Sequence, residues 1–217
     1  MKPALTLEHL CREAAKFSDL ETSHHESKLY GVTDGKAVGT YLEQKFTAYL
    51  SENYRFEPGN SASGIDFPEL EVDLKVTSIR QPQSSCPFQS ATQKVFGLGY
   101  HLLIFVYEKS DDAARRTGRL EIKHVVFIDK TRTADFQTTK GLIGILDRGG
   151  NKDDIIAFIL ERNLPVDEVG ADRLADRILE LQITQGYLTI SNALQWRLQY
   201  SRAIQQAGSL STILQIR

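Results

Sequence analysis

A short segment in the first half of the chain carries the residue types that cleave phosphodiester bonds with a metal ion. Residues 64–78 read GIDFPELEVDLKVTS, where Asp66 precedes an alternating stretch that holds Asp73 and Lys75. Residues two apart in a strand point to the same face and lie about 7 Å apart. Carboxylate oxygens are preferred ligands of Mg²⁺, which stabilises charge on a phosphate and lowers the pKa of an attacking water. A lysine on the same face can contact that water or a phosphate oxygen.

The alternative interpretation of this segment is a solvated strand face. In that case Glu71, Asp73 and Lys75 are surface residues and Asp66 is a turn residue. An acid-x-lysine triplet is common, so the spacing alone does not decide between the two interpretations. An aspartate placed just before a clearly alternating strand favours catalysis.

The apolar periodicity predicts the elements that must position these residues. Helices are expected over residues 5–17 and 36–52, then near 153–162 and 171–182. Strands are expected over 70–77, 101–107 and 122–128, with an exposed connection between the last two. A short strand is expected at 186–190, and the last segment looks helical. This order predicts an α/β fold with a mixed central β-sheet flanked by helices.

The motifs resemble those of the PD-(D/E)xK nuclease superfamily, and within it the MutH-like restriction and repair endonucleases. In that group a metal-binding aspartate is followed by an aromatic residue, and then by an apolar-acid-Leu-Lys strand. Here Asp66-Phe67 is followed by Val72-Asp73-Leu74-Lys75. The second acid is an aspartate where the family usually has a glutamate, which shortens its reach by one methylene. The resemblance implies a restriction-endonuclease-like core and a Mg²⁺ cofactor.

The same resemblance adds a glutamate from the helix upstream. The family has a Gly-x-x-Leu-Glu type sequence there, and residues 39–43 read GTYLE. It implies that Glu43, Asp66 and Asp73 are metal ligands and that these three and Lys75 are catalytic. The family also has a further active-site lysine between its two core strands, for which Lys94 is the candidate.

The charge distribution indicates where DNA would be contacted. The net charge is −2, yet residues 74–107 and 181–217 contain no acid. A polyanion responds to such a local positive face more than to the net charge. The two segments hold the expected contacts to double-stranded DNA, which are Arg80, Gln81, Gln83, Gln89, Lys94, Tyr187, Arg197 and Arg202.

Composition excludes several classes of protein. The chain has 217 residues, 41% of them hydrophobic and 25% charged, which is typical of a globular domain. No apolar run is long enough to span a membrane, and two cysteines do not make a disulfide framework. We expect a cytoplasmic protein with one nuclease domain over residues 1–217, in which residues ~150–217 form a helical, DNA-binding lobe.

These observations lead to a sequence-specific type II restriction endonuclease as the expected function. The alternatives are a MutH-like mismatch-repair enzyme that nicks one strand, and a non-catalytic DNA-binding module on a decayed nuclease fold. A homodimer is expected if the recognised sequence is palindromic, although MutH-like proteins include monomers. A cognate DNA methyltransferase would be a genetic rather than a physical partner.

Overall fold

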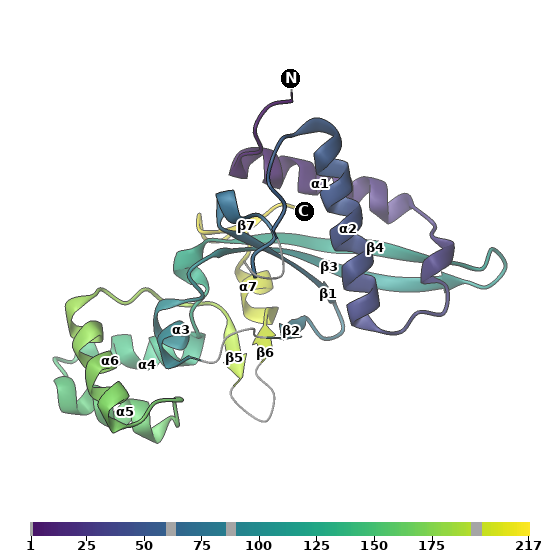
Figure 1. The fold of residues 1–217 in the computed structure, drawn as a ribbon. Coiled ribbons are helices and arrows are strands. Elements are labelled where there is room, and N and C mark those ends of the chain that lie inside the picture. The colour runs from purple at the N-terminus through teal and green to yellow at the C-terminus, as the bar shows by residue number, and fades with distance from the viewer. Residues whose placement is uncertain (1, 60–63, 86–89, 192–196) are drawn as a thin grey trace.

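A computed structural model describes residues 2–59, 64–85, 90–191 and 197–217. Figure 1 shows a central sheet with two long helices on one face and a group of helices at one end. No helix in these ranges is long and apolar enough to cross a membrane.

The central sheet has four strands in the order β1-β3-β4-β7. The strands are β1 (Val72–Ser78), β3 (His101–Asp112), β4 (Thr117–Ile128) and β7 (Ile213–Gln215). β1 is an edge strand that pairs in parallel with β3, and the other two pairings are antiparallel. β3 is buried on both faces along its first seven residues, as expected for the middle of a sheet.

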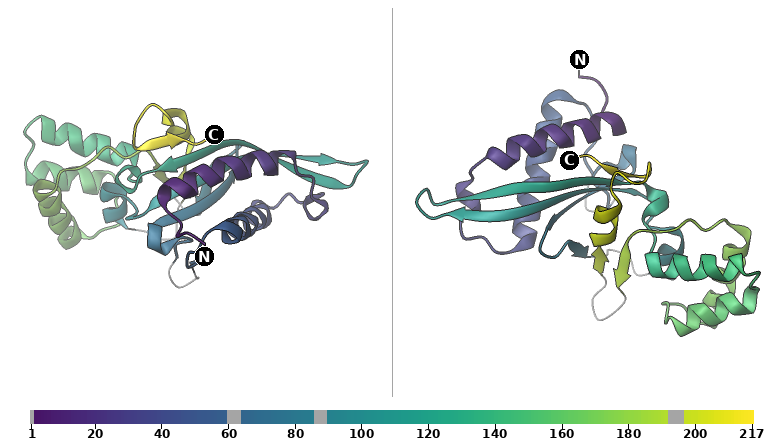
Figure 2. Two further views of the ribbon diagram at one scale, coloured as in Figure 1. Left: turned by 90° about the horizontal axis from the view of Figure 1, so that it is seen from above. Right: turned by 180° about the vertical axis from the view of Figure 1, so that it is seen from behind.

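Two long helices cover one face of the sheet (Figure 2). They are α1 (Leu7–Ser23) and α2 (Gly35–Asn53), capped by the side chains of Thr6 and Asp34. Their apolar stripes meet the β3 side chains at Phe105, whose ring lies 5.1 Å from that of Phe46. α2 therefore lies directly over β1 and β3, which is the position the predicted site requires.

A small second sheet lies beside the central one. Its order is β2-β6-β5, and all pairings are antiparallel between β2 (Gln83–Ser85), β6 (Arg197–Gln199) and β5 (Thr189–Ser191). The buried Thr77 at the end of β1 holds β2 in place. Its hydroxyl accepts a hydrogen bond from Gln83 N (2.9 Å) and lies 3.1 Å from Gln83 O. α7 (Ser201–Gln206) contributes to the apolar core between this sheet and the central one.

A helical lobe has its own apolar core. It contains α3 (Ala91–Phe96), α4 (Phe136–Asp147), α5 (Lys152–Glu161) and α6 (Glu168–Glu180). The buried Asp135 ties it to the small sheet, because its carboxylate accepts hydrogen bonds from Thr138 N (2.8 Å) and Ile190 N (2.8 Å).

The structure confirms the predicted α/β class and most of the elements, with three corrections. The first strand begins at Val72 rather than Leu70, because residues 68–70 form a 3-10 turn and Glu71 has a left-handed backbone (φ 53°). α4 was not predicted, since Gly141 and Gly144 interrupt its apolar stripe. The last segment is not one helix but β6, the six-residue α7 and β7. Its apolar residues are shared between two sheets, so no helical period runs through it.

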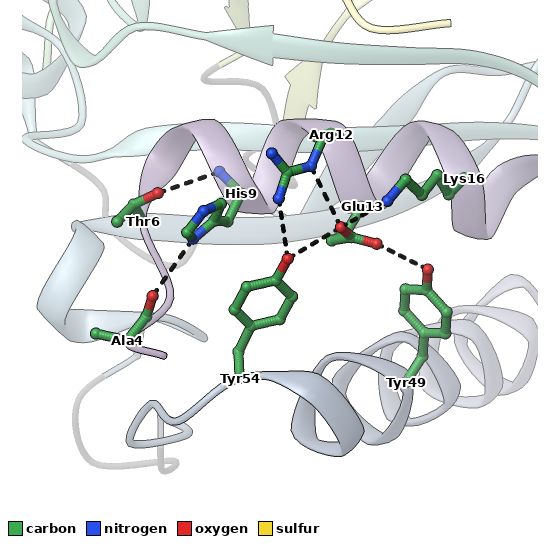
Figure 3. A network of polar contacts seen from close by, with 8 residues as sticks. All are labelled: Ala4, Thr6, His9, Arg12, Glu13, Lys16, Tyr49 and Tyr54. Carbon is green, nitrogen blue, oxygen red and sulfur yellow. Dashed lines mark hydrogen bonds and ion pairs between the residues drawn. The ribbon is translucent and has the colours of Figure 1, made fainter. Parts of the chain in front are cut away.

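A buried carboxylate joins α1 to α2 (Figure 3). Glu13 is 5% exposed and accepts hydrogen bonds from Tyr49 (2.9 Å), Tyr54 (3.0 Å) and Lys16 (3.0 Å). Burial raises the pKa of this carboxyl, but the three donors outweigh burial and lower the pKa to about 2. The network therefore stabilises the fold only while Glu13 is ionised.

We predict that Glu13→Gln lowers the free energy of unfolding at pH 7 by about 2–3 kcal/mol. The folded pKa lies below the ordinary value of 4.5, so the stabilisation is complete above pH 4.5 and disappears as the pH falls towards 2. Urea unfolding at pH 7 and pH 3.5 should show the gap between variant and wild type shrinking in acid. The exposed Glu8 on the same helix provides the control, Glu8→Gln, for which a small and different effect is expected.

Candidate active site

β1 holds Asp73 and Lys75 on one face at the edge of the sheet. Parallel pairing fixes their register, with Asp73 opposite Leu102 and Lys75 opposite Ile104. Lys75 Nζ lies 2.7 Å from Asp73 Oδ2, and the aspartate is 3% exposed. Glu71 does not share this face, because it precedes the strand and forms an ion pair with Lys130.

Asp66 is fixed against β1 by backbone contacts. Its Oδ2 accepts a hydrogen bond from Leu74 N (2.7 Å). Its backbone carbonyl accepts one from Gly59 N (2.7 Å). A Cβ on Gly59 would lie 1.8 Å from the carbonyl oxygen of Ile65, so only glycine allows this close approach.

Glu43 reaches the same place from α2. A hollow of about 310 Å³, here called the carboxylate hollow, brings all four predicted catalytic residues together. It is lined by Glu43, Gly59, Gly64, Ile65, Asp66, Asp73, Leu74 and Lys75. Burial raises the pKa of Glu43, the charge of Asp66 adds to this, and Lys75 opposes it. A larger hollow of about 720 Å³ between α4 and α5 contains none of the four residues.

Asp73 has the most perturbed carboxyl of the group. Burial is the main cause that raises its pKa to about 7, and the neighbouring Asp66 contributes, while Lys75 acts in the opposite direction. Its Oδ2 is buried, and among the described residues it has no donor in hydrogen-bond geometry. The contact with Lys75 is thus a charge pair rather than an aligned hydrogen bond.

The carboxylates of this hollow suit a hard cation that is only partly coordinated by the protein. They do not form a closed cage of protein ligands. No three His, Cys, Asp or Glu side chains within the described ranges converge closely enough to hold an ion alone. Mg²⁺ does not need such a cage, since it commonly keeps several waters and takes one or two carboxylates plus substrate phosphate. The buried Asp73 Oδ2 and the adjacent Asp66 match that requirement.

The small sheet joins the two acid-free segments that were predicted to contact DNA. Gln83 pairs with Gln199, and Ser85 pairs with Arg197. The Arg197 guanidinium also donates to Ser85 Oγ (3.3 Å). Arg80 lies just before β2 and lines a neighbouring hollow with Lys109. Gln81 is exposed in the turn between Arg80 and β2.

Other predicted DNA contacts are engaged within the protein. Lys94 is 6% exposed in α3, where burial lowers its pKa and Asp135 opposes the shift. Tyr187 packs 5.9 Å from the Phe136 ring, and the Arg202 guanidinium lies 3.8 Å over the same ring. Gln89 lies outside the described residues.

Two supporting residues were missed by the sequence analysis. Gly59 holds the Asp66 turn, and Thr77 anchors β2 to the end of β1. Gly59 lies between the helix predicted over 36–52 and the strand predicted over 70–77, where no element is predicted. Thr77 stood in the alternating pattern as one more polar residue of a strand face. The burial of its hydroxyl at the end of a strand would identify Thr77 as an anchor of β2. That burial cannot be read from the sequence.

Comparison with known proteins gives a consistent result. Residues 4–215 match the family described as type II restriction enzyme NspV. The type II restriction enzyme NspV of Nostoc sp. (strain ATCC 29411 / PCC 7524) is 63% identical over 212 residues, which cover 98% of this chain and 96% of that enzyme. No solved structure gives a significant match. A match over nearly the full length shows that the chain belongs to the NspV family of type II restriction enzymes.

Proposed function

We propose that this protein is a Mg²⁺-dependent type II restriction endonuclease of the PD-(D/E)xK, MutH-like type. It hydrolyses both strands of double-stranded DNA at a short sequence. The observation that carries the proposal is the convergence of Glu43, Asp66, Asp73 and Lys75 on one hollow at the edge of the sheet. The 63% identity to a type II restriction enzyme supports the same activity.

In this proposal the four residues have distinct roles. Asp66 and Asp73 would hold Mg²⁺ with support from Glu43, and the bound ion would supply charge stabilisation for a phosphate and a lower pKa for a nucleophilic water. Lys75 orients that water or contacts a phosphate oxygen from the same strand face. The Leu74 amide keeps the Asp66 carboxylate turned towards β1. Asp73 is 3% exposed, and burial strengthens the electrostatic contacts that this carboxyl makes.

DNA would lie across the small sheet and the adjoining edge of β1. Arg80, Gln81, Gln83 and Arg197 are the proposed contacts in and next to β2 and β6, where Arg80 and Gln81 are exposed and Gln83 and Arg197 are half-buried. Lys94, Tyr187 and Arg202 keep their proposed role only if binding releases them from their present surroundings. Gln89 stays a proposed contact outside the described residues. We propose one nuclease domain over residues 1–217, acting in the cytoplasm, and as a homodimer if the recognised sequence is palindromic. Within residues ~150–217, the proposed DNA-binding lobe, α5 and α6 belong to the helical lobe, β5 and β6 to the small sheet, and β7 to the central sheet. The cognate methyltransferase would be its genetic partner.

The competing functions predict different products from a supercoiled plasmid of mixed sequence incubated with Mg²⁺. A restriction enzyme gives discrete linear fragments, whereas a MutH-like repair enzyme gives nicked circles only. A binding module shifts the plasmid in a gel and leaves it intact. Intact DNA under all metal and salt conditions would contradict the proposed activity.

We predict that Asp73→Ala and Lys75→Ala abolish cleavage while DNA binding remains measurable, because they remove a metal ligand and the group that positions water. The matched control is Glu71→Gln, which lies next to β1 but points to Lys130 and should cleave almost normally. Cleavage rates measured under single-turnover conditions distinguish Asp73→Ala and Lys75→Ala from the control. Wild-type cleavage by Asp66→Ala would refute the metal assignment.

We also predict that Asp73→Asn makes the metal-free protein more stable. A carboxyl whose folded pKa of about 7 exceeds the ordinary value of 3.8 stabilises the fold while protonated, and this stabilisation is lost as the pH rises from about 4 to 7. The variant should resemble the wild type near pH 4 and exceed it by about 2–3 kcal/mol above pH 7. Thermal unfolding in EDTA at pH 5 and pH 8 measures the difference. A gap that does not grow with pH would show that burial does not control this carboxyl.

A last prediction concerns the reading surface. Arg80→Ala and Arg197→Ala should each weaken cognate binding by about 1–3 kcal/mol if the side chain reads a guanine edge. A phosphate contact would instead weaken binding to every sequence and flatten the salt dependence. Fluorescence anisotropy with cognate and scrambled duplexes distinguishes the two. If both variants bind and cut like the wild type, the small sheet does not contact DNA.

A further inference from the structure

A second hollow adjoins the carboxylate hollow and shares Glu43 and Lys75 with it. We call it the hydroxyl hollow, and its volume is about 270 Å³. Its lining consists of the N-terminal half of α2, the middle of β1 and the end of β2, at Gly35, Lys36, Gly39, Thr40, Glu43, Lys75, Val76, Ser84 and Ser85. In Figure 1 the start of α2 lies beside the end of β1 where the chain turns towards β2.

The chemistry of this lining suits a phosphodiester. It offers two ammonium groups, three hydroxyls and one carboxylate, that of Glu43. Lys36 is exposed and forms no ion pair within the described ranges. Lys36, Thr40 and Glu43 share one face of α2 because they are three or four residues apart.

The wall opposite α2 is held firmly. Ser84 pairs with Leu198 in the β2–β6 ladder, and its hydroxyl is hydrogen-bonded to that of Tyr200. Thr77 anchors the start of β2 to β1. The distance across the hollow is therefore set by the sheet and by the packing of α2, and not by a loose loop.

Gly39 is the observation that points to a ligand. A glycine inside a helix destabilises it relative to alanine. The fold does not require glycine here, since an added Cβ would make ordinary contacts at 3.9 Å to Glu43 Oε1 and 4.0 Å to Val76 Cβ. That Cβ would stand on the floor of the hydroxyl hollow, between the helix and β1.

We propose that the hydroxyl hollow binds the DNA phosphodiester next to the scissile one, with Lys36 and Thr40 as its contacts. Gly39 lets the sugar–phosphate backbone approach the α2 backbone closely. The proposal rests on the proposed function, because it takes the scissile phosphate to lie in the carboxylate hollow. Lys75 and Glu43, which line both hollows, would then stand between two consecutive phosphates and fix the path of the cleaved strand.

Gly39→Ala tests this directly. The variant should unfold at a temperature equal to or about 2–4 °C above that of the wild type, since the helix gains an alanine. It should bind DNA more weakly and cleave at least about tenfold more slowly, since the backbone is displaced. The control is Gly144→Ala in α4, where the added Cβ meets only the far end of Arg148 at 3.4 Å. It should gain similar stability and retain normal cleavage.

Lys36→Met supplies the second measurement, with the exposed Lys28→Met as its control. Binding of a mixed-sequence duplex is measured in EDTA over a series of salt concentrations. Lys36→Met should lower the affinity and reduce the slope of log K against log salt by about 1, and Lys28→Met should change neither.

Three results would overturn the proposal. One is normal binding and cleavage by Gly39→Ala. Another is slow cleavage with unchanged DNA binding, which would mean that the methyl group disturbs Glu43 instead of the DNA. The third is an unchanged salt slope for Lys36→Met. Failure of the wild type to cut any DNA would contradict the proposed function alone, because the binding comparison in EDTA does not depend on cleavage.

Discussion

The burial of the Asp73 carboxyl on an edge strand is the constraint on which the site depends. A buried carboxylate without an aligned donor must be neutralised by a proton or by a cation. Lys75 provides part of that charge at 2.7 Å, and the adjacent Asp66 increases the demand for more. The pair of aspartates therefore attracts positive charge. The rest of the scaffold holds this pair at the surface of the sheet, where a phosphate can reach it.

The scaffold fixes this edge from three sides. Pairing with β3 sets the register of β1, and α2 places Glu43 above it. The Leu74 amide holds Asp66, and Gly59 holds the turn behind Asp66. The pairing with β3 and the packing of α2 join segments that are distant in sequence, whereas the contacts of Asp66 are local. A change in any one of them would move a carboxylate relative to Lys75. The residues proposed to cleave DNA and the residues that position them are thus parts of one packing arrangement.

The sequence predicted the elements with strong periodicity and the residues within one short motif. α2 and β3 were found because their apolar patterns are long, and Asp73 and Lys75 were placed on one face by a period of two. The register of the β2–β6 pairing was not predictable, since three-residue strands carry no period. Lys94 was expected at the DNA surface but is buried, because its neighbour Asp135 is recruited into the lobe by contacts that no local pattern reveals.

Two positions in the structure oppose stability at the same edge. Asp73 is a carboxyl whose pKa is raised by burial, and Gly39 lies inside α2 where the Cβ of an alanine would make ordinary contacts. Neither choice is explained by packing, since no close contact in the described part of the chain requires it. Both residues border hollows that share Lys75 and Glu43. Residues that cost stability are expected where a ligand supplies the compensating interaction. Their proximity therefore supports the proposal that the two hollows form a single binding surface, in which bound metal and DNA would supply the interactions that the free protein lacks.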